Sequence, residues 1–302
     1  MKPIRVIGAP QDLGAGRRGV DMGPSALRIA RINSQLLELG RSQYDAGNIV
    51  VSIQETQGSG NENARYLHQI ADLCTRLSAD VTRSLSVGEM PLILGGDHSV
   101  AIGTIAGAAS HFQKHGERMG LIWVDAHADM NTPETTPSGN IHGMPLAVSL
   151  GSGPSMLTDI GTVNPKIHPE DTVLIGIRSV DDTERDLVRQ SGVTVFTMRD
   201  IDERGMWPVI QEAIHIATRK TTGTHLSFDV DALDPHLAPG VGTPVSGGLS
   251  YREAHLLMES IADSGSLCSL EVVEINPIID TGNTTAELAV ELVMSALGKR
   301  IL

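Results

Sequence analysis

Aromatic residues are scarce in this sequence. Phenylalanine, tryptophan and tyrosine make up 3% of the 302 residues, whereas hydrophobic residues as a whole make up 40%. A hydrophobic share of that size allows a sizeable core and argues against a disordered chain. Because aromatics are so few, the core has to be aliphatic, which is typical of strands buried within a parallel sheet.

Cysteine is equally rare, and long apolar runs are missing. The two cysteines, Cys74 and Cys268, form no CxxC pair and are too few for a disulfide framework. The opening segment MKPIRVIGAP has no apolar signal-peptide core, and no run approaches the length of a membrane span. We therefore expect a cytoplasmic protein without a membrane partner.

Positive charge is the third shortage. Lysine and arginine total 23 against 36 acidic residues, which gives a net charge of −13, and the basic residues form no cluster. A protein that binds duplex nucleic acid normally carries a basic patch, so we expect no nucleic-acid partner. A negative surface can steer small cationic substrates toward a site, although a need for solubility explains the same charge.

The chain contains short β-branched runs that alternate with longer helical patterns, and it has no internal repeat. This alternation predicts an α/β fold, a three-layer α/β/α sandwich with a mainly parallel central sheet, as a single domain over residues 1–302. Strands are predicted at 4–10, 48–53, 91–96, 121–127, 172–178, 193–198, 225–231 and 270–276. Helices are predicted at 24–40, 62–86, 100–115, 183–191, 207–219, 251–263 and 284–298, with loops at 131–143 and 151–169.

Polar residues follow these predicted strands in an informative way. Each of five strands leads into a group containing Asp, His or Glu: GGDHS, DAHAD, RSVDD, DVDALDP and EINP. Sites in open α/β sheets form at the carboxyl ends of the strands. We therefore expect these five groups to meet in one crevice.

Six of these polar residues have the pattern of a metal site. Asp125, His127 and Asp129 are spaced i, i+2, i+4, so that their side chains share one direction if the strand stays extended to its tip. Asp229 and Asp231 repeat this spacing, and His98 follows a third strand. Any single Asp could simply cap a strand end. Clustered carboxylates, however, repel one another unless cations neutralise them, and four carboxylates with two neutral imidazoles balance two divalent ions.

The predicted ligand set determines which metal and which chemistry to expect. It is rich in oxygen, contains some nitrogen and has no sulfur, which suits manganese better than zinc or magnesium. Two such ions close together make hydroxide available near neutral pH. The sequence therefore predicts a binuclear metal hydrolase.

Several longer segments resemble the ureohydrolase family, and most closely its arginine-hydrolysing branch. They are GAGRRGVDMGPSALR at 14–28, GGDHS at 95–99, WVDAHADMNTP at 123–133, SGNIHGMPL at 138–146, SFDVDALDP at 227–235, GTPVSGGLSYRE at 242–253 and VVEINP at 272–277. The resemblance covers nearly the whole chain. It implies hydrolysis of L-arginine to L-ornithine and urea, two Mn²⁺ ions per subunit and a homo-oligomer, either a trimer or a hexamer.

The resemblance also assigns roles by matching position. One manganese ion would be held by His98, Asp125, Asp129 and Asp229, and the other by Asp125, His127, Asp229 and Asp231, with Asp125 and Asp229 bridging. The catalytic groups would be Asp129, which passes a proton to the leaving amine, His142 as proton shuttle and Glu274 as partner of the guanidinium. Asn131 and Ser138 would bind the substrate α-carboxylate, Asp181 and Glu184 would lie near its α-amino group, and Thr243 would line the pocket.

Other interpretations remain open at this point. Asp181 could merely cap the helix that begins near Asp182. An agmatinase or another guanidino-compound ureohydrolase would use the same metal site. A two-metal phosphoesterase would need basic clamps for the phosphoryl oxygens, and Arg178 is the only basic residue in the matched loops. A non-catalytic relative would lack a ligand or His142, and none of these is missing.

Overall fold

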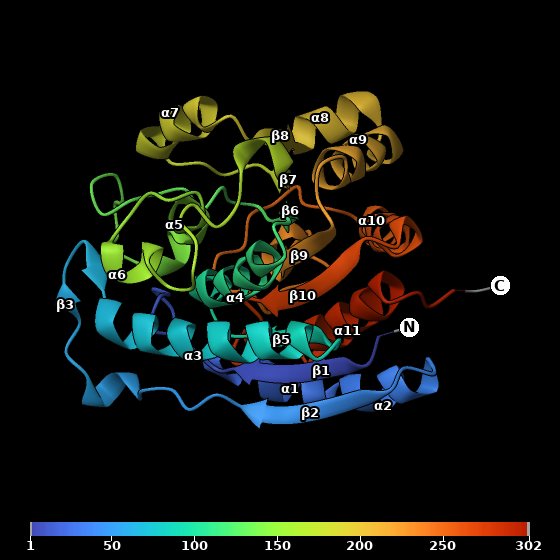
Figure 1. Ribbon diagram of the computed structural model, residues 1–302, viewed down its shortest axis with the longest axis horizontal. Coiled ribbons are helices and arrows are strands. Elements are labelled where there is room, and N and C mark those ends of the chain that lie inside the picture. The colour runs from blue at the N-terminus through green and yellow to red at the C-terminus, as the bar shows by residue number, and fades with distance from the viewer. Residues whose placement is uncertain (1, 301–302) are drawn as a thin grey trace.

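An eight-stranded parallel sheet forms the centre of the protein (Figure 1). The computed structural model describes residues 2–300. The strand order across the sheet is β2-β1-β5-β10-β9-β6-β7-β8. The strands are β1 (Ile4–Ala9), β2 (Gln43–Asn48), β5 (Met90–Gly95), β6 (Met119–Val124), β7 (Thr172–Ile177), β8 (Thr194–Thr197), β9 (Gly223–Asp229) and β10 (Leu267–Val273).

Helices cover both faces of this sheet. One face carries α3 (Leu67–Ser86), α4 (Ala101–Lys114), α5 (Pro145–Ser149) and α6 (Ser155–Thr158). The other carries α1 (Gly23–Ile29), α2 (Ile32–Glu38), α8 (Met198–Arg204), α9 (Met206–Thr218), α10 (Tyr251–Ser264) and α11 (Thr284–Ala296). The remaining helix, α7 (Asp182–Ser191), follows β7. The predicted three-layer sandwich is thus confirmed, with every strand of the central sheet parallel.

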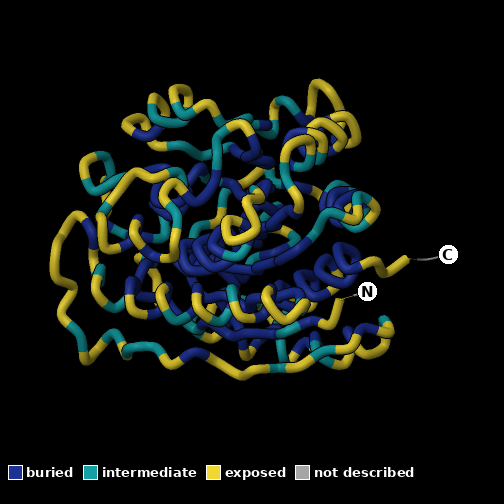
Figure 2. Tube along the Cα trace, in the orientation of Figure 1, coloured by how far each residue is buried: buried dark blue, intermediate teal, exposed yellow. Residues whose placement is uncertain are grey.

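Alternating side chains of the central strands supply two separate hydrophobic cores. In β6, Ile122 and Val124 join the core under α9 and α10, whereas Leu121 and Trp123 join the core under α3 and α4. Figure 2 shows the resulting buried centre with exposed residues around it. Because both faces are covered, the strands read as continuous apolar runs, and this is why they could be predicted from the sequence.

Two of the element predictions near the N-terminus were wrong. The strand predicted at 48–53 lies earlier, at Gln43–Asn48, and overlaps the prediction by one residue. This β2 is an edge strand with mostly exposed or half-buried polar residues, so a search for apolar runs misses it. The single helix predicted at 24–40 is broken into α1 and α2, because Arg31 adopts a left-handed conformation with φ 67°.

Other boundaries also shifted. The helix predicted from residue 62 begins at Leu67, because a short hairpin of β3 (Gly60–Asn61) and β4 (Ala64–Arg65) precedes it. Helix α8 and the short helix α6 were not predicted, and α6 lies within the loop expected at 151–169. None of the helices within residues 2–300 is long and apolar enough to cross a membrane.

Candidate metal centre

The predicted crevice exists at the carboxyl ends of the strands. Residues that follow β6, β7 and β9 line a cavity of about 120 Å³, and residues that follow β5 and β10 pack against its wall. Its walls include ten of the predicted site residues: His127, Asp129, Asn131, Ser138, His142, Asp181, Glu184, Asp229, Asp231 and Thr243. The other three, His98, Asp125 and Glu274, are buried and contact members of this wall.

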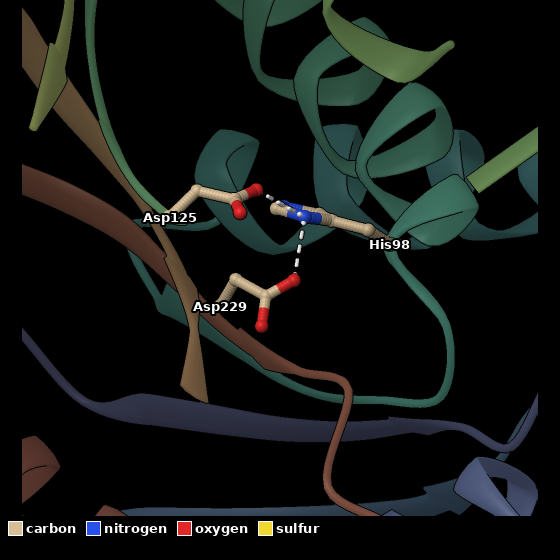
Figure 3. A group of neighbouring side chains, drawn as sticks. All are labelled: His98, Asp125 and Asp229. Atoms are coloured by element: carbon tan, nitrogen blue, oxygen red, sulfur yellow. Dashed lines mark ion pairs between the residues drawn. The ribbon is translucent and has the colours of Figure 1, made fainter. Parts of the chain in front are cut away.

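The first group of candidate ligands surrounds the ring of His98. Its Nδ1 lies 3.1 Å from Asp125 Oδ2, 3.2 Å from Asp129 Oδ2 and 3.1 Å from Asp229 Oδ2. Figure 3 shows the carboxylates of Asp125 and Asp229 pointing toward this ring from two sides. The side chain of His98 is buried, and Nδ1 has no hydrogen-bond partner of acceptable geometry. The Nδ1 atom of His98 thus lies among three carboxylate oxygens, and a metal ion bound between them would have all four as ligands.

The second group lies beside the first and shares Asp125 with it. His127 Nδ1 is 3.4 Å from Asp125 Oδ1 and 3.1 Å from Asp231 Oδ2. Ligand atoms of Asp125, His127 and Asp231 lie within 4.8 Å of one another, as do those of His98, Asp125 and Asp229. Asp125 therefore has the position of a bridging ligand. Of these two groups, Asp229 is a member of the first, and its Oδ1 accepts a hydrogen bond from the Asp231 amide at 2.8 Å.

The backbone brings these ligands together differently from the prediction. We expected an extended strand through Asp129, but β6 ends at Val124, and Asp129 adopts a left-handed conformation with φ 50°. The Asp125 carboxylate accepts a hydrogen bond from the His127 amide at 2.7 Å, which turns the chain at the strand end. Asp229 makes the same turn with Asp231. The i, i+2 spacing thus reflects two Asx turns rather than extended backbone.

The charges of the cluster also fit a pair of cations. Burial, reinforced by repulsion from Asp125, raises the pKa of Asp129 to about 6. Burial and neighbouring carboxylates raise the pKa of Asp229 and Asp231 as well. Asp129, Asp229 and Asp231 therefore resist ionisation together unless positive charge is supplied. Oxygen and imidazole donors without sulfur fit manganese, so the residues present suit the expected ions.

A second layer of buried polar residues holds His98 in place. Its Nε2 lies 2.8 Å from Ser227 Oγ, and Ser227 donates to Glu271 Oε1 at 2.8 Å. Glu271 also contacts His225 at 3.2 Å. If Nδ1 is a ligand, Nε2 must carry the proton, and this chain of acceptors fixes that tautomer. The sequence prediction missed Ser227, Glu271 and His225; the polar residues at alternating positions of β9 were the available signal.

Trp123 supports the same ring from another side. The indole stacks on His98 with centroids 4.0 Å apart and an angle of 8° between the planes. Its Nε1 donates to Asp125 Oδ2 at 3.0 Å. One fully buried side chain thus orients a ligand from each of two strand ends.

Glu274 and His142 form a pair beside the first ligand group. Glu274 Oε1 lies 3.0 Å from His142 Nδ1 and accepts a hydrogen bond from the His98 amide at 2.9 Å. Burial opposes protonation of His142, but the contact with Glu274 outweighs it and raises the pKa of His142 to about 9. His142 is therefore held as a cation near neutral pH in the free protein.

The residues expected at the substrate α-groups gather at the cavity rim. Asn131 Nδ2 donates to Asp181 Oδ2 at 3.1 Å. Asp181 occupies the N-cap position of α7, but its side chain makes no capping hydrogen bond. The carboxylate is therefore turned toward the cavity rather than toward the helix. Glu184 is buried and accepts a hydrogen bond from the Met130 amide at 2.6 Å, and burial raises its pKa to about 7.

Two further predicted residues lie on the cavity wall with their hydroxyl groups already engaged. Thr243 donates to Asp231 Oδ2 at 2.9 Å, so it contacts a candidate metal ligand. Ser138 Oγ accepts a hydrogen bond from the Asn140 amide at 3.2 Å. The wall also contains Thr136 and Ser179, which were not predicted as site residues. Hydroxyl and amide side chains in a loop give little signal in a single sequence.

Comparisons with known proteins point to one family. A profile of the Arginase family matches residues 2–298. The chain is 50% identical to an arginase from Bacillus caldovelox and 49% identical to one from Bacillus subtilis, over 100% of this chain and 99–100% of each relative. The solved B. caldovelox structure superposes with a TM-score of 0.96 over the full length of both chains. An Entamoeba histolytica arginase solved with L-ornithine is 36% identical, with a TM-score of 0.91 over 99% of this chain and 100% of that one. Sequence, fold and site geometry together make this chain a member of the Arginase family.

Proposed function

We propose that this protein is a binuclear manganese hydrolase that converts L-arginine and water to L-ornithine and urea. The observation that carries the proposal is the free oxygen of Glu274. Oε1 is engaged by His98 and His142, whereas Oε2 is buried and has no hydrogen-bond partner. A Cβ atom on Gly242 would lie 3.6 Å from Oε2, so the glycine keeps the space beside this oxygen open. A planar cation with N–H donors is the group that such an oxygen binds.

The metal ligands lie next to this carboxylate. We assign His98, Asp125, Asp129 and Asp229 to one Mn²⁺ and Asp125, His127 and Asp231 to the other, to which the family resemblance adds Asp229. When bound, the two ions would polarise water for attack on the guanidinium carbon, which is a poor electrophile. Glu274 would fix the guanidinium plane in this position.

The remaining residues handle protons and orientation. Asp129 would carry a proton to the leaving amine, and His142 would exchange protons with solvent because its side chain is 18% exposed. Asn131 and Ser138 would bind the α-carboxylate of the substrate, while Asp181 and Glu184 would accept from its α-amino group. This polar rim favours arginine over agmatine, which has no α-carboxylate.

A phosphoesterase is disfavoured by the surroundings of Arg178. All three guanidinium nitrogens of this residue donate to backbone carbonyls, so none is free to clamp a phosphoryl group. Five carboxylates line the cavity (Asp129, Asp181, Glu184, Asp229 and Asp231), and they would repel a phosphate.

The proposal can be tested with metal-stripped protein reloaded with Mn²⁺. We expect two manganese ions per chain and urea release from L-arginine that a chelator abolishes. Agmatine and p-nitrophenyl phosphate serve as competing substrates. Faster turnover of agmatine would overturn the arginine assignment, and a single ion per chain would overturn the binuclear site. Light scattering of the same sample tests the predicted trimer or hexamer.

A further inference from the structure

Arg178 joins three segments that contribute to the second ligand group. It follows β7, and β6 lies between β7 and β9 in the sheet. Its backbone amide donates to Ala126 O at 2.9 Å, between the ligands Asp125 and His127. Its side chain reaches beyond β6 to the turn after β9, where Asp231 lies.

The guanidinium is saturated by backbone carbonyls. Nη2 donates to Asp231 O at 2.7 Å and Leu233 O at 3.2 Å, and Nη1 donates to Ala232 O at 3.1 Å and Gly176 O at 3.3 Å. Nε and Nη2 both donate to Val245 O, at 3.2 and 2.7 Å. Arginine has five N–H donors, so these six contacts use all of them. Lysine could not reproduce this planar array.

Val245 belongs to a loop that closes on itself above the cavity. Leu233 and Leu249 form an isolated β-bridge at its base, and Asp234 Oδ2 accepts from the amides of Gly247 and Gly248 at 2.9 and 3.3 Å. This closing loop, residues 233–249, carries Thr243, whose hydroxyl holds Asp231 Oδ2. Arg178 is thus bonded to the loop at one end and to the backbone of Asp231 at the other.

The Arg178 guanidinium is packed so closely that no side chain fits at position 248. A Cβ atom on Gly248 would lie 2.6 Å from Arg178 Nη2 and 2.5 Å from the carbonyl carbon of Leu233. Position 248 therefore has to be glycine for Arg178 to sit in this place. Asp231 Oδ1 in turn accepts from the Ala126 amide at 3.2 Å, so the two segments that Arg178 connects also contact each other.

We infer that Arg178 is the positioning residue of the second metal group, holding Asp231, its Thr243 partner and the Asp125–His127 segment in register. The inference rests on the proposed binuclear site. The first group, around His98, is supported instead by Ser227 and Trp123. Loss of Arg178 should therefore weaken one ion much more than the other, whereas a purely structural role would weaken neither selectively.

The matched control is Arg118, at the other end of the same strands. It precedes β6 and pairs with Glu170 and Asp171 just before β7, far from the ligand turns along the strand direction. Arg118→Met and Arg178→Met each remove an arginine that ties β7 to its surroundings. Only the second should change metal binding.

The experiment is a stepwise Mn²⁺ titration of metal-free wild type, Arg178→Met, Arg178→Lys and Arg118→Met, followed by calorimetry. We expect wild type and Arg118→Met to bind two ions alike, and Arg178→Met to bind one ion normally and the other at least about tenfold more weakly. Arg178→Lys should lie between them, and it keeps the test usable if Arg178→Met does not fold. Amide exchange of Gly247 and Leu249 should speed up in the Arg178 variants only.

A double variant provides the second test. Because Arg178 and Thr243 act on the same ligand, Arg178→Lys with Thr243→Val should weaken the second ion no more than the worse single variant does. The inference would be overturned if an Arg178 variant weakened both ions to the same extent or weakened neither. It would also be overturned if the loss of affinity in the double variant equalled the product of the losses in the two single variants. A wild type that binds fewer than two ions would instead overturn the proposed binuclear site, so the two failures are distinguishable.

Discussion

Replacing Glu274 by glutamine separates the charge of this residue from its shape. The amide oxygen of the new side chain could still accept from the His98 amide, as Glu274 Oε1 does at 2.9 Å. The negative charge beside His142 and beside the open space at Gly242 would be lost. Two independent quantities should respond: recognition of the substrate cation and the pKa of His142.

The effect on His142 can be worked out from its pKa. The Glu274 contact is the main cause that raises this pKa from 6.5 to about 9, which corresponds to about 3 kcal/mol at 1.36 kcal/mol per unit. Because the folded-state pKa is the higher one, this stabilisation is fully present below pH 6.5 and is lost as the pH rises through 9. The stability difference between wild type and Glu274→Gln should therefore change by about 3 kcal/mol between pH 6 and pH 9.5.

The assay is a histidine NMR titration of the metal-free protein, which avoids paramagnetic broadening. In Glu274→Gln the His142 pKa should fall to about 6.5 or lower. His255 on α10, which contacts Ser295 of α11, serves as the internal reference and should not move. Loss of one charge-assisted hydrogen bond, about 1.5–3 kcal/mol, should lower kcat/KM for arginine roughly 10- to 150-fold at unchanged metal content. An unchanged His142 pKa together with unchanged kcat/KM would refute this account of Glu274.

Three further predictions concern the cavity wall. Asp181→Ala should raise KM for arginine but change the free energy of unfolding by less than about 0.5 kcal/mol, because the carboxylate accepts a hydrogen bond from Asn131 and caps no helix. A free energy of unfolding that falls by about 1 kcal/mol, with KM unchanged, would instead support the capping interpretation. His142→Asn should lower kcat by about 10² or more with two Mn²⁺ still bound, and an unchanged kcat would remove the shuttle role. Burial raises the pKa of Glu184 to about 7, so its contribution to stability is present below pH 4.5 and is lost as the pH rises to 7. Metal-free Glu184→Gln, whose amide oxygen can still accept from the Met130 amide, should have the same free energy of unfolding as wild type at pH 4.5 and one about 3 kcal/mol higher above pH 7, measured by denaturant titration. A variant that is less stable than wild type above pH 7 would contradict this prediction.

The sequence predicted much of the sheet because of how a parallel sheet is buried. Strands covered on both faces are apolar throughout, so the six central strands from β1 to β7 stood out. The same reasoning failed at the edge strand β2, whose polar residues face solvent. The break between α1 and α2 was equally hidden, because nothing in the local pattern announces a left-handed Arg31.

The candidate ligands could be read from the sequence for a related reason. Parallel strands place all their carboxyl ends at one edge, so Asp, His and Glu residues that follow apolar runs must lie near one another. Charge balance then indicated two cations from the sequence alone. The i, i+2 spacing selected residues that the structure does bring together, but the local reason differs: Asx turns at Asp125 and Asp229, not extended backbone, direct the side chains.

What only the tertiary structure decided is how these ligands are held. The cross-strand pairs Ser269–His225 and Glu271–Ser227 depend on the register between β10 and β9, which no single strand encodes. The reach of Arg178 across β6 to Asp231 depends on the strand order of the folded sheet. Composition and periodicity specify the faces and ends of the strands, because burial acts on each segment separately. Register and order arise from packing between distant segments, and the residues that position the metal ligands therefore emerged only in the folded chain.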